Sequence, residues 1–294
     1  MIRPGHGFVS SVKTALKAPL FFCARISRKR PLFVARVCRL RWTGRRRPYI
    51  IDKKGAFGYK NAGKTGGNMG NNGLGPVIGG KRAALFDMDG VLLDSLWVWH
   101  RVGLDFFAEN DVPVDRQAVQ DIRDMGFMQS ADYLVKRFGL HTTPEKIVAG
   151  WVEKALPAYA NEVALMPGAG ALVGRLLGKG LRLAVVTASD AALAGAALKR
   201  TGIAGAFEAI VTEDEAGLHK DGPELFLHAA RLLDVPPESC VVFEDSLYAM
   251  KSAKAAGMAV CALCPPERKA EAQACKAVAD LLVESLETLL AAGG

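Results

Sequence analysis

The stretch FDMDGVLLDS at residues 86–95 places acidic residues at the end of an apolar run. Asp87 and Asp89 are separated by one residue, and Gly90 follows them. Carboxylates at this spacing are suited to attack an electrophile, to exchange a proton or to bind a cation. The motif therefore indicates a candidate chemical site at the point where a buried strand ends.

Polar residues also end other apolar runs of the chain. Thr187 and Ser189 follow one run, Glu244 and Asp245 follow another, and Lys220 lies between the two in HKDGPELF. Clustered carboxylates repel one another and raise each other's pKa, so such a cluster needs a compensating charge. A hard divalent cation supplies that charge, and an oxygen-only ligand set suits Mg²⁺. The pattern predicts Mg²⁺ as the cofactor.

A phosphate group gives each of these residue types a task. The Asp87 carboxylate is suited to attack phosphorus and form an aspartyl-phosphate, which divides one difficult displacement into two. Asp89 is placed to protonate the leaving oxygen and then to deprotonate the attacking water. Thr187 with the amides after it would hold the phosphate oxygens, while Lys220 would stabilise charge in the transition state. We therefore expect phosphoryl transfer.

The elements that must position these residues alternate regularly from residue 81 onward. Continuous apolar runs indicate strands covered on both faces, and strand–helix alternation indicates a parallel sheet with right-handed crossovers. The fold class is therefore α/β, a doubly wound parallel sheet, in which ligands bind beyond the carboxyl ends of the strands. The apolar runs lie within 83–89, 182–189, 207–214, 239–246 and 258–263, and the helical stretches are 168–180, 191–202, 223–234 and 247–257.

Four motifs in order give the chain a family resemblance. They are FDMDGVLLDS, VVTAS, Lys220 with PELF, and VVFEDS followed by KAAGM. With them, residues 82–285 resemble the haloacid dehalogenase-like (HAD) hydrolases, specifically the branch that includes β-phosphoglucomutase-like phosphatases. One D-x-D-G motif is a weak signal, whereas the ordered set of four is specific.

The resemblance implies roles for the site residues. Asp87 would be the nucleophile and Asp89 the acid/base. Mg²⁺ would be bound by the Asp87 carboxylate, the Asp89 main-chain oxygen and Asp245, with Glu244 supporting the metal through water. The same resemblance assigns phosphate binding to Thr187, the Ala188 amide and Lys220.

Helical stretches replace the strand pattern between residue 95 and about residue 165. Such an all-helical insertion after the first catalytic strand resembles the helical cap of the family, which closes over the site and selects the substrate. We therefore expect a HAD core of 81–95 and 166–290 with a helical cap domain of 96–165. The expected helical stretches lie at 96–110, 116–125, 130–139 and 144–160.

The cap residues help to separate phosphatase from mutase. The sugar-phosphate mutases of the family carry a His ten residues after the acid/base Asp, where this chain has Trp99, with His100 one place later. They also carry a cap Arg that grips a second phosphate, and alignment on Gly126 puts Gln129 there. Without that cation a bisphosphate is difficult to hold. Trp99, His100 and Gln129 stay candidate substrate contacts.

The predicted function is therefore a Mg²⁺-dependent phosphomonoester hydrolase that acts on a small sugar-like or nucleotide-like phosphate. A sugar phosphomutase of the β-phosphoglucomutase type is the alternative. A third hypothesis is a nucleic-acid-docking protein with an idle hydrolase fold, which the small number of aromatic residues in the basic arm disfavours. We expect a monomer whose partner is a small phosphorylated metabolite.

Departures from the family pattern concern loop geometry. His219 and Asp221 flank Lys220, where the family commonly has Gly and Pro. The resemblance therefore does not predict the geometry of the loop around Lys220. Asp94 and Ser95 precede a helical stretch, and either is expected to cap that helix.

The first 80 residues form a basic arm of different composition. Residues 1–68 hold 17 of the 38 basic residues and one of the 30 acidic ones, so the formal charge is about +16 there and about −8 afterwards. The arm shows no sustained periodicity, and its Gly- and Asn-rich end at 61–80 predicts disorder without a helix or strand.

The arm has two interpretations. It resembles an organelle transit peptide, or it is an over-extended reading frame with the true start at Met69. We expect a cytoplasmic location, or a mitochondrion or plastid if the arm is a transit peptide. Whether residues 1–68 are translated, cleaved or retained stays open.

Other sequence signals are interpreted as structural. Residues 58–65 match G-x-x-x-x-G-K-[ST], but the strand and helix that a P-loop requires are missing around them, so the match is attributed to chance. Cys261 and Cys264 have C-x-x-C spacing without a second pair, which indicates core residues. No apolar run approaches the roughly 18 residues of a membrane span.

Overall fold

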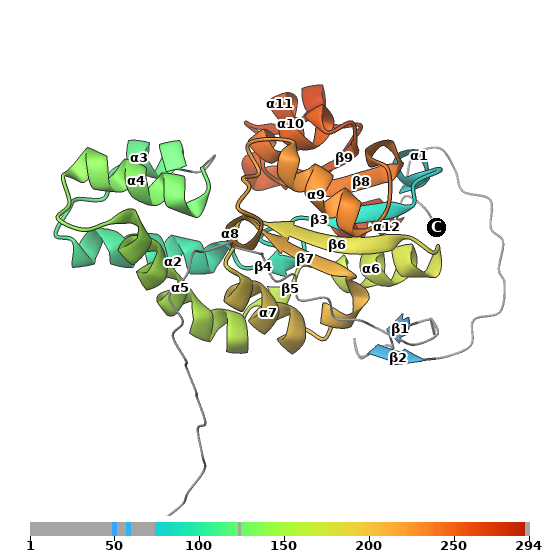
Figure 1. Cartoon of the computed structure of the whole chain (residues 1–294), viewed down its shortest axis with the longest axis horizontal. Helices are drawn as coiled ribbons and strands as arrows, with labels where there is room; N and C mark the ends of the chain where they lie inside the picture. Colours follow the sequence, from blue (N-terminus) through green and yellow to red (C-terminus); the bar gives the residue numbers. More distant parts are fainter. Residues whose placement is uncertain (1–48, 52–56, 60–73, 123–124, 292–294) are drawn as a thin grey trace, which may run out of the picture. The chain divides into compact units, whose positions relative to one another are not determined.

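The predicted strands form one parallel sheet (Figure 1). The computed structural model of the chain describes residues 49–51, 57–59, 74–122 and 125–291. The sheet has the strand order β10-β9-β8-β3-β6-β7, and all neighbouring strands are parallel. Its strands are β3 (Ala83–Phe86), β6 (Arg182–Thr187), β7 (Ala209–Thr212), β8 (Cys240–Glu244), β9 (Ala259–Leu263) and β10 (Leu281–Val283). The predicted fold class is confirmed.

The register places the ends of the central strands side by side. Phe86 of β3 lies opposite Val185 of β6 on one side and Phe243 of β8 on the other. The residues that follow these three positions therefore meet at one edge of the sheet. This arrangement brings the motif at residues 86–95 together with residues about 100 and 155 positions later in the chain.

Alternation along the strands gives the sheet two buried faces. Ala84 and Phe86 belong to one apolar cluster, whereas Ala83 and Leu85 belong to another, because successive side chains of a strand point to opposite faces. Helices α6 (Ala169–Gly178) and α7 (Ala191–Arg200) supply the first cluster. Helices α9 (Glu224–Leu232), α10 (Leu247–Ala255) and α11 (Ala272–Val278) supply the second. The sheet is thus covered on both sides, as a doubly wound fold requires.

A helical insertion separates β3 from β6, as predicted. Its helices are α2 (Leu96–Glu109), α3 (Arg116–Asp121), α4 (Phe127–Phe138) and α5 (Pro144–Asn161). It is bordered by an antiparallel pair of two-residue strands, β4 (Leu93–Asp94) and β5 (Ala164–Leu165). We call this segment the helical insertion.

The helical insertion has an apolar cluster of its own. Phe106 and Phe107 of α2 pack there with Leu134 of α4. Val98 of α2 and Tyr159 of α5 belong instead to the first cluster of the sheet, the one that contains Phe86 and residues of α6 and α7. Helices α2 and α5 therefore share residues with both clusters and join the insertion to the sheet.

Two sequence expectations about secondary structure were incomplete or wrong. Strand β10 was not predicted, because three residues in a leucine-rich segment carry no strand periodicity of their own. The expectation of no helix before residue 81 is wrong at α1 (Leu74–Ile78), where Leu74, Val77 and Ile78 are buried. Burial of these apolar side chains in the core outweighs the weak helix propensity of the surrounding glycines.

The basic arm contains one further described feature, an antiparallel pair formed by β1 (Tyr49–Ile51) and β2 (Phe57–Tyr59). Helix and strand were excluded only for 61–80, so this short pair lies outside that expectation and was not predicted. The rest of the arm up to residue 73, with most of the P-loop-like match, lies outside the described residues. Among the residues that the structure describes, no helix combines the length and apolar character needed to cross a bilayer.

Candidate active site

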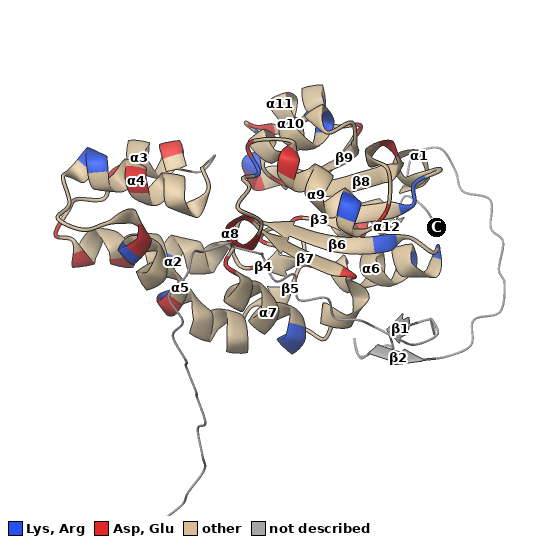
Figure 2. Ribbon diagram, in the orientation of Figure 1, with Lys and Arg blue, Asp and Glu red and all other residues tan. Residues whose placement is uncertain are grey.

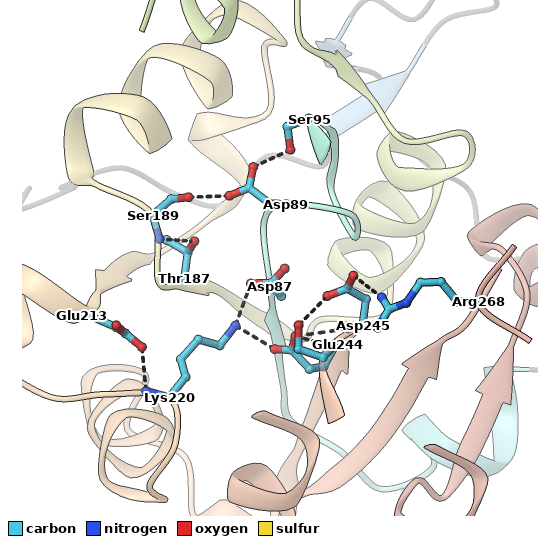
Figure 3. Close-up of polar contacts among 11 residues, drawn as sticks. Asp87, Asp89, Ser95, Thr187, Ser189, Glu213, Lys220, Glu244, Asp245 and Arg268 are labelled. Carbon is cyan, nitrogen blue, oxygen red and sulfur yellow. Dashed lines mark hydrogen bonds and ion pairs between the residues drawn. The ribbon is translucent and has the colours of Figure 1, made fainter. Parts of the chain in front are cut away.

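An ion-paired cluster occupies the edge of the sheet where β3 and β8 end (Figure 3). Asp87 directly follows β3, and Glu244 is the last residue of β8. Lys220, in the loop before α9, reaches both of them, because its Nζ lies 2.6 Å from Asp87 Oδ1 and 2.7 Å from Glu244 Oε2. All three side chains are buried. The structure thus brings together three predicted residues that are 24 to 157 positions apart in sequence.

Asp245 adds a third carboxylate to the cluster. One carboxylate oxygen each from Asp87, Glu244 and Asp245 lies within 4.8 Å of the others. Glu244 Oε2 is buried and, among the described residues, accepts no hydrogen bond of good geometry, although Lys220 Nζ is close to it. Buried oxygens that converge in this way fit a hard divalent cation such as Mg²⁺. The residues present therefore fit the predicted metal.

The electrostatics of the cluster favour the binding of a cation. Burial, with the nearby charge of Asp87, raises the pKa of Glu244 to about 8, and Lys220 offsets only part of this effect. Burial and Asp87 likewise raise the pKa of Asp245 to about 6. Burial alone would lower the pKa of Lys220, but the carboxylates of Asp87 and Glu244 raise it well above its usual value. The lysine therefore stays charged, while the carboxylates are under-compensated.

Gly90 is required by the close packing of this edge. Its φ of +85° lies in the left-handed region, which residues with a Cβ rarely adopt. A Cβ at this position would lie 2.8 Å from Asp245 Oδ2. The glycine of the D-x-D-G motif thus allows the loop after β3 to approach the carboxylate that follows β8.

Asp89 is surrounded by hydroxyl groups. Ser95 Oγ and the Tyr159 hydroxyl donate hydrogen bonds to Oδ1, and Ser189 Oγ donates to Oδ2 at 2.5 Å. Burial, followed by the charge of Asp87, raises the pKa of Asp89, and the three hydroxyls oppose that rise. A carboxyl group in this environment is suited to hold and exchange a proton.

The environment of Asp89 corrects one sequence interpretation. Ser95 was expected to cap the helix that follows it, but its side chain makes no capping bond to α2 and is turned to Asp89. Asp94 lies exposed in β4. The physical reason is that Ser95 is fully buried, so its hydroxyl bonds to the carboxylate that the fold brings beside it.

The predicted phosphate-binding residues lie at the end of β6. Thr187 is buried, and its Oγ1 accepts a hydrogen bond of 3.0 Å from the Ser189 amide. Ala188 stands between them and is partly exposed. Because β6 pairs with β3, this turn lies at the same sheet edge as Asp87.

The cap residues of the prediction have three different positions. Trp99 of α2 donates from Nε1 to the Tyr159 hydroxyl at 2.8 Å and is therefore connected to Asp89 through that tyrosine. Gln129 of α4 donates from Nε2 to Asp221 Oδ2 at 3.0 Å, next to Lys220 in sequence. His100 is exposed on α2, and the described contacts do not connect it to the cluster.

Three residues near the site were missed by sequence reasoning. Glu213 begins α8 (Glu213–Ala216), is buried, and accepts the Lys220 amide on Oε1 at 2.8 Å. Tyr159 contacts Asp89 from the helical insertion, and Arg268 donates to Asp245 Oδ2 at 2.7 Å. Of the three, only Glu213 could have been predicted from sequence, because it follows an apolar run as the predicted acids do. Tyr159 and Arg268 belong to no local motif.

Comparison with known proteins agrees with this geometry. Residues 81–257 match the family model described as haloacid dehalogenase-like hydrolase. The chain belongs to this family. As a HAD hydrolase it has the expected parallel sheet with a helical segment inserted after the first strand, and the predicted recognition is confirmed.

Curated relatives of this HAD hydrolase include phosphatases. It is 28% identical over 211 residues to hexitol phosphatase B of Escherichia coli, with 71% of this chain and 94% of that protein covered. It is 29% identical over 185 residues to β-phosphoglucomutase of Bacillus subtilis, with 60% and 80% covered. The predicted enzyme class, a HAD-type phosphatase, is confirmed.

A third relative and one solved structure complete the comparison. The chain is 35% identical over 187 residues to the chloroplastic protein SUPPRESSOR OF QUENCHING 1 of Arabidopsis thaliana. This match covers 60% of this chain but only 17% of that much longer protein. The crystal structure of a CbbY mutant from Rhodobacter sphaeroides in complex with xylulose-(1,5)bisphosphate is similar with a TM-score of 0.62 and 27% identity. That match covers 72% of this chain and 98% of CbbY.

Proposed function

We propose that the protein is a Mg²⁺-dependent phosphomonoester hydrolase that acts through an aspartyl-phosphate on a small sugar-like phosphate. The observation that carries this proposal is the contact of one buried lysine with two carboxylates, Asp87 and Glu244, beside a third, Asp245. A buried cluster of this kind is costly for folding and suits the binding of a cation and an anion together.

In this proposal Asp87 attacks the phosphorus atom of the ester. Its position directly after β3 fixes the carboxylate at the sheet edge, and Lys220 at 2.6 Å offsets the repulsion between two anions. The turn at Thr187 and the Ala188 amide would hold the phosphate oxygens. Asp87, Asp245 and the main-chain oxygen of Asp89 would hold the Mg²⁺, with Glu244 in support, and the bound ion would neutralise charge on the phosphate.

Asp89 would act as the acid and then as the base. Its carboxyl group would give a proton to the ester oxygen as the bond to phosphorus breaks, and would accept one from the water that hydrolyses the aspartyl-phosphate. The raised pKa of Asp89, caused mainly by burial, supports the first step. The hydroxyls of Ser95 and Tyr159 would hold the carboxyl group between the two steps.

The substrate class rests on relatives and on the cap. A hexitol phosphatase and a structure with a sugar bisphosphate are among the similar proteins, which supports a sugar-like phosphate over a nucleotide. The core of 81–95 and 166–290 would carry the chemistry, and the cap domain of 96–165 would select the substrate. Tyr159 of the cap bonds directly to Asp89, Trp99 bonds to Tyr159, and Gln129 bonds to Asp221 beside Lys220.

Transfer to water is favoured over transfer to a second sugar hydroxyl. Alignment on Gly126 puts Gln129 at the place where the mutases carry a cationic residue, and the Gln129 side chain bonds to Asp221. A neutral amide paired with an acid offers a second phosphate little attraction. The similarity to a β-phosphoglucomutase keeps the mutase as the alternative that the experiment must test.

The location of the protein is a separate proposal. We propose the cytoplasm, with a plastid as the alternative because one relative is named as chloroplastic. Fluorescence microscopy of the full chain and of a variant lacking residues 1–68, each fused to a fluorescent protein, separates these locations.

The deciding experiment is phosphate release from a panel of sugar, hexitol, nucleotide and aryl phosphates, with Mg²⁺ and with EDTA. We expect release from sugar-like esters with Mg²⁺ only, and a loss of about 10³-fold or more in Asp87→Asn. The matched control is Asp94→Asn, an exposed acid of the same motif, which should retain activity. Equal rates for Asp87→Asn and wild type would refute the mechanism, and isomer formation that requires a bisphosphate would favour the mutase.

A further inference from the structure

An arginine contacts a carboxylate of the proposed metal site. Arg268 Nη1 lies 2.7 Å from Asp245 Oδ2, and the two side chains are 18% and 10% exposed. Asp245 Oδ1 accepts a bond of 3.1 Å from Ser246 Oγ, so both oxygens of this carboxylate have donors from the protein. The arginine is therefore a resident counter-ion of a group that would also bind the cation (Figure 3).

Arg268 is held in place independently of Asp245. Its Nε and Nη2 donate to Glu271 Oε2 at 3.1 and 2.5 Å, which leaves Nη1 directed to Asp245. The backbone is fixed by a turn in which the Arg268 amide donates to the Pro265 carbonyl at 2.9 Å. Pro265 and Pro266 are the first two residues of this turn and restrict the chain further. The guanidinium is thus positioned by its own loop.

The loop lies at the same sheet edge as the carboxylates. Arg268 follows β9, and β9 pairs with β8 in parallel, with Glu244 of β8 opposite Ala262 of β9. A fixed positive charge at this place stabilises Asp245 as an anion when no cation is bound. It also repels any cation that shares the carboxylate, since like charges a few ångströms apart in a buried site interact strongly.

We propose that Arg268 is a positioning residue that sets the affinity of the site for its divalent cation. The guanidinium holds the Asp245 carboxylate in the absence of the ion and weakens binding of the ion. The inference rests on the proposed metal site. Its additional claim is that the bound cation exchanges with ions in solution, because Arg268 keeps the affinity low. Glu271 moderates the effect by sharing the guanidinium.

The test is titration calorimetry of MgCl₂ and MnCl₂ into the purified full chain. We expect Arg268→Gln to bind the ion about tenfold more tightly than wild type, because a fixed charge near the ion is removed. Arg268→Lys keeps the charge and should return the dissociation constant close to the wild-type value. Glu271→Gln removes a negative charge and should weaken binding about threefold. The two neutralising variants therefore have opposite predicted signs.

The control is Arg182→Gln, which breaks a surface Arg–Glu pair of 2.6 Å at the opposite end of β6. It should leave the dissociation constant unchanged. Binding by Arg268→Gln that is equal to or weaker than wild type would overturn the inference while the metal site stands. If Arg268→Gln does not fold, tighter or unchanged binding by Glu271→Gln overturns it. No binding by wild type would overturn the metal site and the inference together.

Discussion

The edge of the sheet and the helical insertion differ in whether their charged side chains are buried. At the sheet edge Lys220, Glu244 and Asp245 are buried and in contact with other ionisable groups. In the helical insertion the buried cluster is apolar, and a charged pair such as that of Arg137 with Asp115 is partly exposed. Basic and acidic residues are scattered along the helices of the insertion (Figure 2).

The difference separates residues that serve chemistry from residues that serve folding. Removing ions from water costs more free energy than their attraction commonly returns, so a buried ion pair is weak evidence for stability. An apolar cluster such as that of Phe106 and Leu134 stabilises the fold directly. The burial of charge at the sheet edge therefore opposes stability, as the proposed active site requires.

The strongest test of this comparison is Lys220→Met. The change keeps an unbranched side chain that is one atom shorter, but leaves Asp87 and Glu244 without their common cation. We expect phosphate release to fall about 10³-fold and the free energy of unfolding to fall by about 3–5 kcal/mol. Urea unfolding and steady-state kinetics measure the two effects.

The control for that variant is Lys254→Met, which removes a surface lysine paired with Asp280 at 2.9 Å. It should leave the activity unchanged. If Lys220→Met retained wild-type activity and stability, the buried charges would have no special role at the sheet edge.

In the helical insertion the largest effect should come from an apolar residue. Leu134 is 1% exposed in the cluster of the insertion, so Leu134→Ala should lower the free energy of unfolding by about 2–5 kcal/mol. The Mg²⁺ dissociation constant should stay unchanged, because the three carboxylates lie at the ends of strands β3 and β8 and not in the insertion. Chemical unfolding and calorimetry check the two statements.

Leu104 offers the matched control in the same insertion. It is 44% exposed, and Leu104→Ala should change stability by less than about 0.5 kcal/mol. A large loss in Leu104→Ala, or weaker metal binding in Leu134→Ala, would show that the two regions are not as separate as their clusters indicate.

The pH dependence of metal binding sharpens the description of the sheet edge. Glu244 and Asp245 have pKa values raised to about 8 and about 6 by burial and by Asp87, so protons compete with the cation near neutrality. Binding of the cation favours the ionised carboxylates, so affinity should rise with pH, by about 100-fold between pH 6 and 8 when both carboxylates must ionise. Calorimetry in two buffers of different ionisation enthalpy should detect proton release. Affinity that falls with rising pH would contradict the assignment of these ligands.

The smallest effect is expected at a surface pair of the insertion. Arg137→Gln breaks the 2.6 Å contact with Asp115, and neither the unfolding midpoint nor the activity should change measurably. The hydrogen bond from Arg137, followed by that from the Ala118 amide, holds the pKa of Asp115 below its usual value. NMR titration of the variant should show that pKa shifted upward but still low, because the amide bonds remain. An unchanged Asp115 pKa would contradict this account.

Local sequence was sufficient to predict an element or a site residue where apolar residues recur periodically or where the residue belongs to a motif. The five longer strands and the four helices of the insertion were predicted, because apolar periodicity is a property of neighbouring residues. The contact of Lys220 with Asp87 and Glu244 was predicted as a convergence at one sheet edge, since parallel strands place their carboxyl ends together. Helix α1 and strand β10 were missed because tertiary packing, and no local pattern, stabilises such short elements.

The sequence by itself determined the family, the parallel sheet and the acids at the ends of its strands, because all of these depend on residue order and local periodicity. Only the tertiary structure decided which other groups surround those acids. Tyr159 approaches Asp89 from the helical insertion, and Arg268 approaches Asp245 from the loop after β9. Contacts between residues so far apart in the chain depend on how the layers pack, and no local pattern of residues encodes them.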